Sequence, residues 1–341
     1  APWLAHHRTN VSAAAERVVY EGRLPDPQLI VGVVNVPTDT YSTRPDDQSA
    51  YQVGLRQQFP PGDTLNLRSR RAEKELTREE ARLEAERRNL LRQVRQTWLE
   101  IYYLNHSLRL LGETRRLQQK QLEAAEGRYR AAADMQQALS RARQALARVN
   151  EREPMLKAQS ARARAQLGRW IGDAAALALP VALPALPVPA PDFDAVRHPE
   201  LLAAEAMHNA ARLEVDMARQ EYKPGWMLDL QYGFRRPMPD GTERPDMVTA
   251  MVTFDLPIFR SKRQDRRLAE KQALESGARL ETEDKRRELV AMHQSMRAEY
   301  EALAARARIF EEQLLPAIRR EAQVTVAGFA RDQTEYREAQ M

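Results

Sequence analysis

Histidines are the candidate metal ligands of this sequence, because the chain contains no cysteine. His6 and His7 are adjacent, and His198 and His208 lie ten residues apart. None of the histidines has the i, i+4 partner and nearby carboxylate that zinc-binding helices use. The absence of cysteine also excludes disulfides and thiol catalysis. We therefore expect no metal ion, no cofactor and no catalytic residue, so the chain is not predicted to be an enzyme.

Charged residues gather at two places where long helical patterns weaken. Asp134 lies at the first of these turns, and Arg331, Asp332 and Glu335 lie at the second. In a symmetric oligomer each of them would form a ring, and a ring of carboxylates at a constriction favours cations. The alternative is that they are ordinary solvated turn residues.

The elements that position these residues occur twice, at a constant offset of 197 residues. Pro27 matches Pro224, and Pro60 matches Pro257. The run 81–84 (ARLE) recurs at 278–281 in the same frame. A period this long is far outside the roughly 20–50 residues of solenoid repeats, so we expect two large units with the same fold that pack side by side.

Each copy contains two amphipathic strands. Residues 28–36 and 51–59 form the first pair, and residues 226–234 and 248–256 form the second, with apolar and polar side chains alternating in three of the four. That two-residue period places apolar side chains on one face of a strand. About ten residues suffice to cross a bilayer as a tilted strand. The side chains predicted to face lipid are Trp226, Leu228, Leu230, Tyr232, Phe234, Val252 and Phe254.

Each strand pair is followed by a very long helix. No proline occurs between residues 64 and 153, or between 258 and 315. A 65-residue helix would span about 100 Å. A heptad-like spacing predicts coiled-coil packing in both copies. The first seam is Leu90, Val94, Thr97, Ile101, Leu104, Leu108 and Leu111, and the second is Leu289, Met292, Met296, Tyr300, Leu303, Ala307, Phe310 and Leu314.

A turn near residues 128–137 would let the first helix double back into a second helix over 138–170. Shorter helices are expected over 11–23 and 200–222, and the proline-rich stretch 172–199 is typical of an extended connector between the copies. The second copy ends at Met341 soon after its equivalent turn, so we expect its returning helix to be missing from this sequence.

Four strands cannot close a barrel alone, since the smallest common barrels have about eight. Open sheet edges do not occur in lipid. If these strands meet a membrane, several chains must therefore share one barrel. The net charge of +5, with both signs interleaved along the helices, indicates solvated helix faces and no nucleic-acid-binding patch.

This order of elements resembles the TolC-type outer-membrane efflux proteins, and most closely their heavy-metal branch, which serves resistance-nodulation-division pumps. The resemblance covers nearly the whole chain. Its most specific signals are the run 24–28 (LPDPQ) before the first strand, the run 57–60 (QQFP) after the second, the run 255–259 (DLPIF) with 262–264 (KRQ) in the second copy, and the helical tip from Arg128 and Tyr129 to 141–143 (RAR).

The resemblance implies a mixed α/β, mainly α, fold. Three chains would share a twelve-stranded barrel in the bacterial outer membrane above a periplasmic tunnel of α-helical hairpins. It implies barrel strands at 28–60 and 225–258, tunnel helices at 62–170 and 259–341, and equatorial helices and connector at 1–27 and 171–224. The partners would be a periplasmic adaptor protein and an inner-membrane pump, and the duct would conduct substrate passively, with heavy-metal cations as candidates.

In the family the periplasmic tips close through polar links and open on docking. The residues expected at the gate or adaptor contact are Arg128, Tyr129, Asp134, Arg331, Asp332 and Glu335. Two departures affect the tip: Ala132 replaces a common glycine, and Gly328 lies one residue early in the second copy. Many relatives carry an N-terminal lipidated cysteine, which this sequence lacks, so that anchor is expected to be trimmed or absent.

Two other classes compete with the duct. A periplasmic adaptor, an interaction protein with coiled-coil hairpins, normally carries one hairpin and not a double repeat with two strand pairs. A cytoplasmic coiled-coil scaffold would not explain the four amphipathic strands.

Overall fold

The structure is a computed structural model, and it describes residues 2–44, 46, 48–131, 136–178, 182–186 and 192–324. The helices are α1 (Pro2–Glu21), α2 (Thr64–Ala131), α3 (Gln136–Ile171), α4 (Pro199–Gln220) and α5 (Gln264–Ile309), and the strands are β1 (Gln28–Val34), β2 (Ala50–Phe59), β3 (Trp226–Phe234) and β4 (Met247–Phe254).

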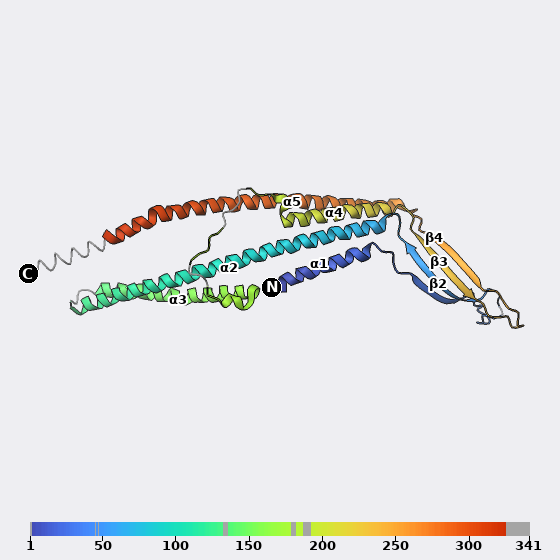
Figure 1. Cartoon of the computed structure of the whole chain (residues 1–341), viewed down its shortest axis with the longest axis horizontal. Coiled ribbons are helices and arrows are strands. Elements are labelled where there is room, and N and C mark those ends of the chain that lie inside the picture. Colours follow the sequence, from blue (N-terminus) through green and yellow to red (C-terminus); the bar gives the residue numbers. More distant parts are fainter. Residues whose placement is uncertain are drawn as a thin grey trace, which may run out of the picture.

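The molecule is elongated, with the sheet at one end and the end of α2 and the start of α3 near the other (Figure 1). Helices α1 and α3 follow one another along α2, and residues from the start of α1 and the end of α3 line one shared pocket on α2. Helix α4 lies between α2 and α5 and contacts both. The two long helices therefore carry the shorter ones along their sides.

The four strands form one antiparallel sheet in the order β1-β2-β3-β4. The two hairpins, one from each copy, join through β2 and β3, where Arg56 pairs with Asp229 and Leu55 with Leu230. Among the described residues, β1 and β4 each have one edge without a partner strand. The predicted pair of hairpins is confirmed, and the structure adds that they share a sheet.

The core of the helical part lies between α2 and α3. Ile101 and Leu104 of the first predicted seam are buried against Ala163 and Leu167 of α3. Thr97 is buried on the same face. Apolar side chains at alternating steps of three and four residues keep one stripe of α2 turned toward its partner, so the first seam is confirmed.

The second seam has no such partner helix in the described part of the chain. Leu289 is 3% exposed, whereas Met296 and Leu303 are 54% and 55% exposed. The regular α-helix ends at Ile309 and is followed by a π-helical turn over Phe310–Leu314, after which helical structure continues to residue 324. Pro316 has no N–H for the carbonyl of Glu312, which favours such an irregularity.

Several element boundaries differ from the sequence prediction, and β1 ends at Val34, two residues before the predicted end. Helix α1 begins at Pro2 and not near residue 11, because Leu4 and His7 already continue the face formed by Val11 and Ala14. Strand β4 ends at Phe254, two residues early. Helix α5 begins at Gln264 and not at 258, because the chain after Pro257 first forms a short 3-10 turn over Arg260–Lys262.

Among the described residues, none of the helices combines the length and the apolar composition of a membrane-spanning helix.

Candidate functional site

The strand registers place most of the large apolar side chains of the four strands on one face of the sheet. Leu29 lies opposite Leu55, and Leu55 lies opposite Leu230. One step along, Val31, Val53 and Tyr232 form an equivalent row. The predicted lipid-facing residues belong to this face, and their exposed fractions include 49% for Leu230, 46% for Tyr232, 51% for Phe234, 48% for Val252 and 57% for Phe254. Trp226 is 37% exposed, and Leu228 is half-buried.

The opposite face is polar and carries one cross-strand ion pair. Arg56 Nε donates to Asp229 Oδ1 at 2.5 Å, and Arg56 Nη2 donates to Asp229 Oδ2 at 3.4 Å. Asp229 is only 2% exposed. A buried carboxylate needs a charged partner, and the directly opposite position in the register supplies it. The other polar residues of this face are Gln28, Gln52, Gln58, Gln231, Thr249 and Thr253. A smaller set of apolar residues also lies on it: Ile30, Val34, Met227, Met247 and Met251.

Gly54 lets β2 and β3 approach closely on the polar face. A Cβ at this position would lie 2.6 Å from Gln231 Cγ and 2.7 Å from the carbonyl oxygen of Leu230. Only glycine leaves this space free. The side chain of Gln231 therefore lies across the strand pair beside the Arg56–Asp229 ion pair.

The two loops at the far end of the sheet are held together by one buried arginine. Arg244 is 8% exposed and donates to the backbone carbonyls of Thr43 (3.0 Å), Asp46 and Arg236 (2.8 Å from Nε). Carbonyls from both copies thus converge on one guanidinium group, whose five N–H donors suit this role. Sequence reasoning missed Arg244, because a single arginine in a turn-rich segment carries no local signal.

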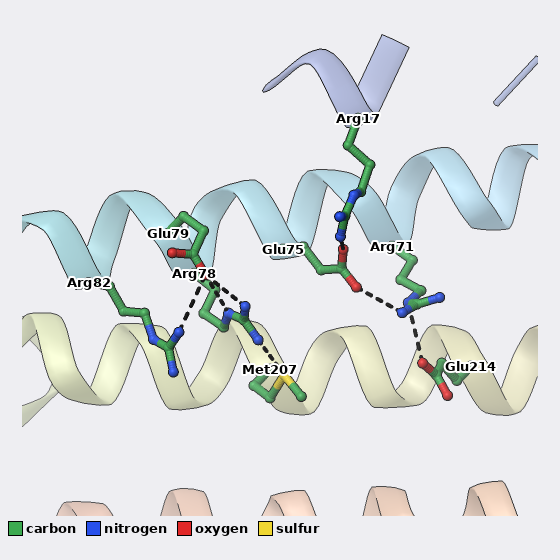
Figure 2. Close-up of polar contacts among 8 residues, drawn as sticks. All are labelled: Arg17, Arg71, Glu75, Arg78, Glu79, Arg82, Met207 and Glu214. Carbon is green, nitrogen blue, oxygen red and sulfur yellow. Dashed lines mark hydrogen bonds and ion pairs between the residues drawn. The ribbon is translucent and has the colours of Figure 1, made fainter. Parts of the chain in front are cut away.

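A chain of ion pairs links four helices near the sheet. Figure 2 shows its part on α1, α2 and α4. Arg17 of α1 binds Glu75 of α2 at 3.1 Å, and Arg71 binds both Glu75 at 2.9 Å and Glu214 of α4 at 3.3 Å. Glu214 also accepts from Lys271 of α5 at 2.5 Å. Arg17 and Glu214 occupy equivalent positions of the repeat, so the two copies use opposite charges at the same place. The hydrogen bond with Glu75 is the main reason that the pKa of Arg17 is raised.

The residues predicted at the gate lie mostly outside the described residues. This holds for Asp134, Arg331, Asp332 and Glu335, and for the side chain of Arg128 in the last turns of α2. Tyr129 is described and is 39% exposed. Their roles therefore stay predictions.

The histidines are distributed over separate environments. His208 Nε2 lies 2.8 Å from Glu275 Oε1, and His293 stacks on Phe193 of the connector with 4.8 Å between ring centroids. His198 caps the start of α4 by accepting from the backbone N–H of Glu200 at 3.4 Å. Within the described ranges, His, Asp and Glu side chains nowhere form a group of three or more that could hold a metal ion.

The family described as "Outer membrane efflux protein" matches residues 1–173 and 195–340. No curated protein matches the chain closely enough to count as a relative.

The fold is shared at low sequence identity by a number of solved structures, among them the following three. The outer membrane protein VceC from Vibrio cholerae has a TM-score of 0.75 and 18% identity, with 94% of this chain and 80% of that one covered. A membrane protein from Pseudomonas aeruginosa has a TM-score of 0.71 and 21% identity over 94% and 80%. CusC, described in terms of transmembrane channel formation, has a TM-score of 0.70 and 18% identity over 92% and 77%. At these identities the likeness establishes the fold.

Proposed function

Because this chain belongs to the outer membrane efflux protein family, it is an outer-membrane efflux channel of a tripartite pump, and we propose that it works as a homotrimer that forms the exit duct. Each chain would add its sheet to one barrel in the outer membrane and its helical hairpins to one tunnel in the periplasm. The duct would conduct substrate passively.

The sheet is the observation that supports the homotrimer, because it has one apolar face, one polar face and, among the described residues, two edges without a partner strand. Its apolar face suits lipid, and its polar face, with Arg56 and Asp229, suits a water-filled interior. The free edges of β1 and β4 need partners before the sheet can lie in lipid. Three copies of four strands supply twelve, with β4 of one chain beside β1 of the next.

We assign residues 28–60 and 225–258 to the barrel, 62–170 and 259–341 to the tunnel, and 1–27 and 171–224 to an equatorial region. Trp226, Tyr232 and Phe254 would lie toward lipid, since aromatic side chains favour membrane interfaces. Three ion-pair networks like that in Figure 2, one per chain, would then brace the tunnel just below the barrel.

The proposed gate lies at the periplasmic tip. Asp134 and the segment with Arg331, Asp332 and Glu335 would form charged rings there, while Arg128 and Tyr129 would contact a periplasmic adaptor. The adaptor would join the duct to an inner-membrane pump of the resistance-nodulation-division class. Carboxylate rings favour cations, which supports heavy-metal cations as a candidate cargo.

Oligomeric mass and bilayer insertion test this proposal. The full-length mature chain is expected to run as a trimer in mild detergent and to form pores in planar bilayers. A detergent-independent soluble monomer without conductance would contradict the duct and favour the periplasmic adaptor.

Two neighbouring residues of β4 provide a matched test of the two faces. Val252 lies on the apolar face and Thr253 on the polar face, and both side chains are exposed. Val252→Arg is expected to cost about 2–4 kcal/mol if it lies near the bilayer midplane, and so to lower the yield of inserted trimer, whereas Thr253→Arg is tolerated. Equal yields of the two variants would show that the apolar face does not meet lipid.

A further inference from the structure

Features that weaken a helix occur in both copies at the same position of the repeat. In the first copy, Gly112 lies inside the continuous helix α2. In the second copy, the equivalent position is Ile309, the last α-helical residue before the π-helical turn Phe310–Leu314. Sharp changes in helix direction are usually found at proline, glycine or π-bulges, and here such features coincide in level although their residues differ.

The helix that packs against α2 also contains a residue at this level that weakens it. Pro154 lies inside α3 and has no N–H to donate to the carbonyl of Asn150. A cavity of about 30 Å³ lies between the two helices here, lined by Leu108, Leu111, Gly112, Arg115, Val149 and Glu153. Both helices of the hairpin are therefore weakened where their packing is incomplete.

The glycine at this position is not required for space. A Cβ at Gly112 would meet no atom within 4 Å. Glycine destabilises a helix interior by roughly 1 kcal/mol relative to alanine, and no close packing contact compensates for it. What glycine supplies here is a backbone that bends more easily.

Charged side chains span the two helices at the cavity. Arg115 of α2 donates to Glu153 of α3, and Lys157 binds the same carboxylate at 2.8 Å. Above this level, toward the sheet, Ile101, Leu104 and Leu167 pack as a buried core. The ion pair between Arg115 and Glu153 thus replaces apolar packing where the helices are weakest.

We propose that this level is a hinge shared by both copies. The hinge comprises Gly112 with Pro154 in the first hairpin and the turn Phe310–Leu314 with Pro316 in the second. The segments between the hinge and the tip would swing about it when the duct opens, while the core around Ile101 stays rigid. The gating role of the hinge rests on the proposed function, but its existence does not.

Hydrogen exchange on the full-length chain in mild detergent tests whether the hinge exists. Amides of residues 108–116 and 310–318 are expected to exchange on the order of tenfold faster than amides of 97–104, since local opening depends on local contacts. Gly112→Ala should slow exchange at 108–116 by about fivefold. Protection that is uniform through this level, or unaffected by Gly112→Ala, would overturn the hinge.

Gly277 offers a matched control. It also lies inside a long helix, and a Cβ added there would meet no atom within 4 Å, but it is away from the hinge level. Gly277→Ala raises helix propensity equally, so it separates a general gain in helix stability from an effect on the hinge. It is expected to leave exchange at 108–116 unchanged.

Single-channel recording tests the use of the hinge in gating. The double variant Gly112→Ala/Pro154→Ala should open at least about fivefold less often than Gly277→Ala, because both changes favour a regular helix. The Arg115→Gln channel should open more often, because the substitution removes the ion pair with Glu153. If the wild type forms no pores, the proposed function fails; if it forms pores and the double variant opens normally, the hinge has no role in gating.

Discussion

Asp229 shows how a single residue can be placed by its partner across a sheet. Its carboxylate is almost completely buried on the polar face, and Arg56 supplies both of its close charged contacts. Removing one partner of such a pair leaves an uncompensated charge, which is more costly than losing the pair as a whole. The pair therefore also fixes the register in which the two copies of the repeat join.

His198 gives the start of α4 a pH dependence. Burial is the main reason that its pKa lies below the usual 6.5; Arg88 and Lys285 also lower the pKa, and Glu200 opposes them. Its Nδ1 must be unprotonated to accept the N–H of Glu200. The unfolded chain thus binds this proton more readily, so the contribution of His198 to stability is present above pH 6.5 and is lost as pH falls below it.

We expect the start of α4 to exchange its amides faster at about pH 5.5 than at about pH 8, after correction for intrinsic rates, because protonation removes the cap. His198→Asn keeps a capping side chain but does not titrate, so its exchange should change less over this range. The same pH response in both proteins would assign the effect to other histidines.

Among the elements, the helices near the sheet are joined by charge as much as by apolar packing. Glu214 of α4 binds Arg71 of α2 and Lys271 of α5, and it is partly buried between them. Isolated surface pairs contribute little, but shared pairs in a network contribute more. Helix α4 therefore acts as the link between the long helices of the two copies.

Glu214→Gln is expected to lower the unfolding free energy by about 1 kcal/mol, since two cations lose their shared partner. Thermal denaturation of the detergent-solubilised chain would measure this. Glu221→Gln is the control, because Glu221 makes a single, more exposed pair with Arg267 at 3.2 Å between the same two helices, α4 and α5. Equal shifts in Tm for the two variants would argue against a special role for the network.

In the molecule as a whole, the sheet and the tip lie at opposite ends of the long helices (Figure 1). A barrel in the outer membrane would place the gate deep in the periplasm, within reach of an adaptor. The gate and the barrel can then be altered separately, because no described contact joins the two ends directly.

Asp134→Ala and Asp332→Ala are expected to raise the basal conductance of the trimer several-fold, because under the proposed gate each would remove a polar link that holds the closed state. Glu123→Ala provides the control, since Glu123 is an exposed charged residue of α2 short of the tip. Conductance that rises equally in all three variants, or in none, would show that Asp134 and Asp332 do not form the gate.

The elements of this fold could be predicted from the sequence, because each element leaves a local period. Alternation over 226–234 indicated β3 with its correct bounds, and the spacing of Thr97, Ile101 and Leu104 indicated the face of α2 that α3 covers. The constant offset of the repeat showed that two similar units had to coexist. These patterns can be recognised locally because side-chain direction follows the backbone period.

Which distant segments meet could be learned only from the folded chain. The joining of β2 to β3, the Arg56–Asp229 pair, the convergence of two loops on Arg244 and the four-helix ion network all connect residues far apart in the sequence. A strand period is the same for every possible neighbour, and an arginine carries the same charge beside any carboxylate. Folding selects one register and one set of partners, because packing and charge compensation must be satisfied everywhere at once.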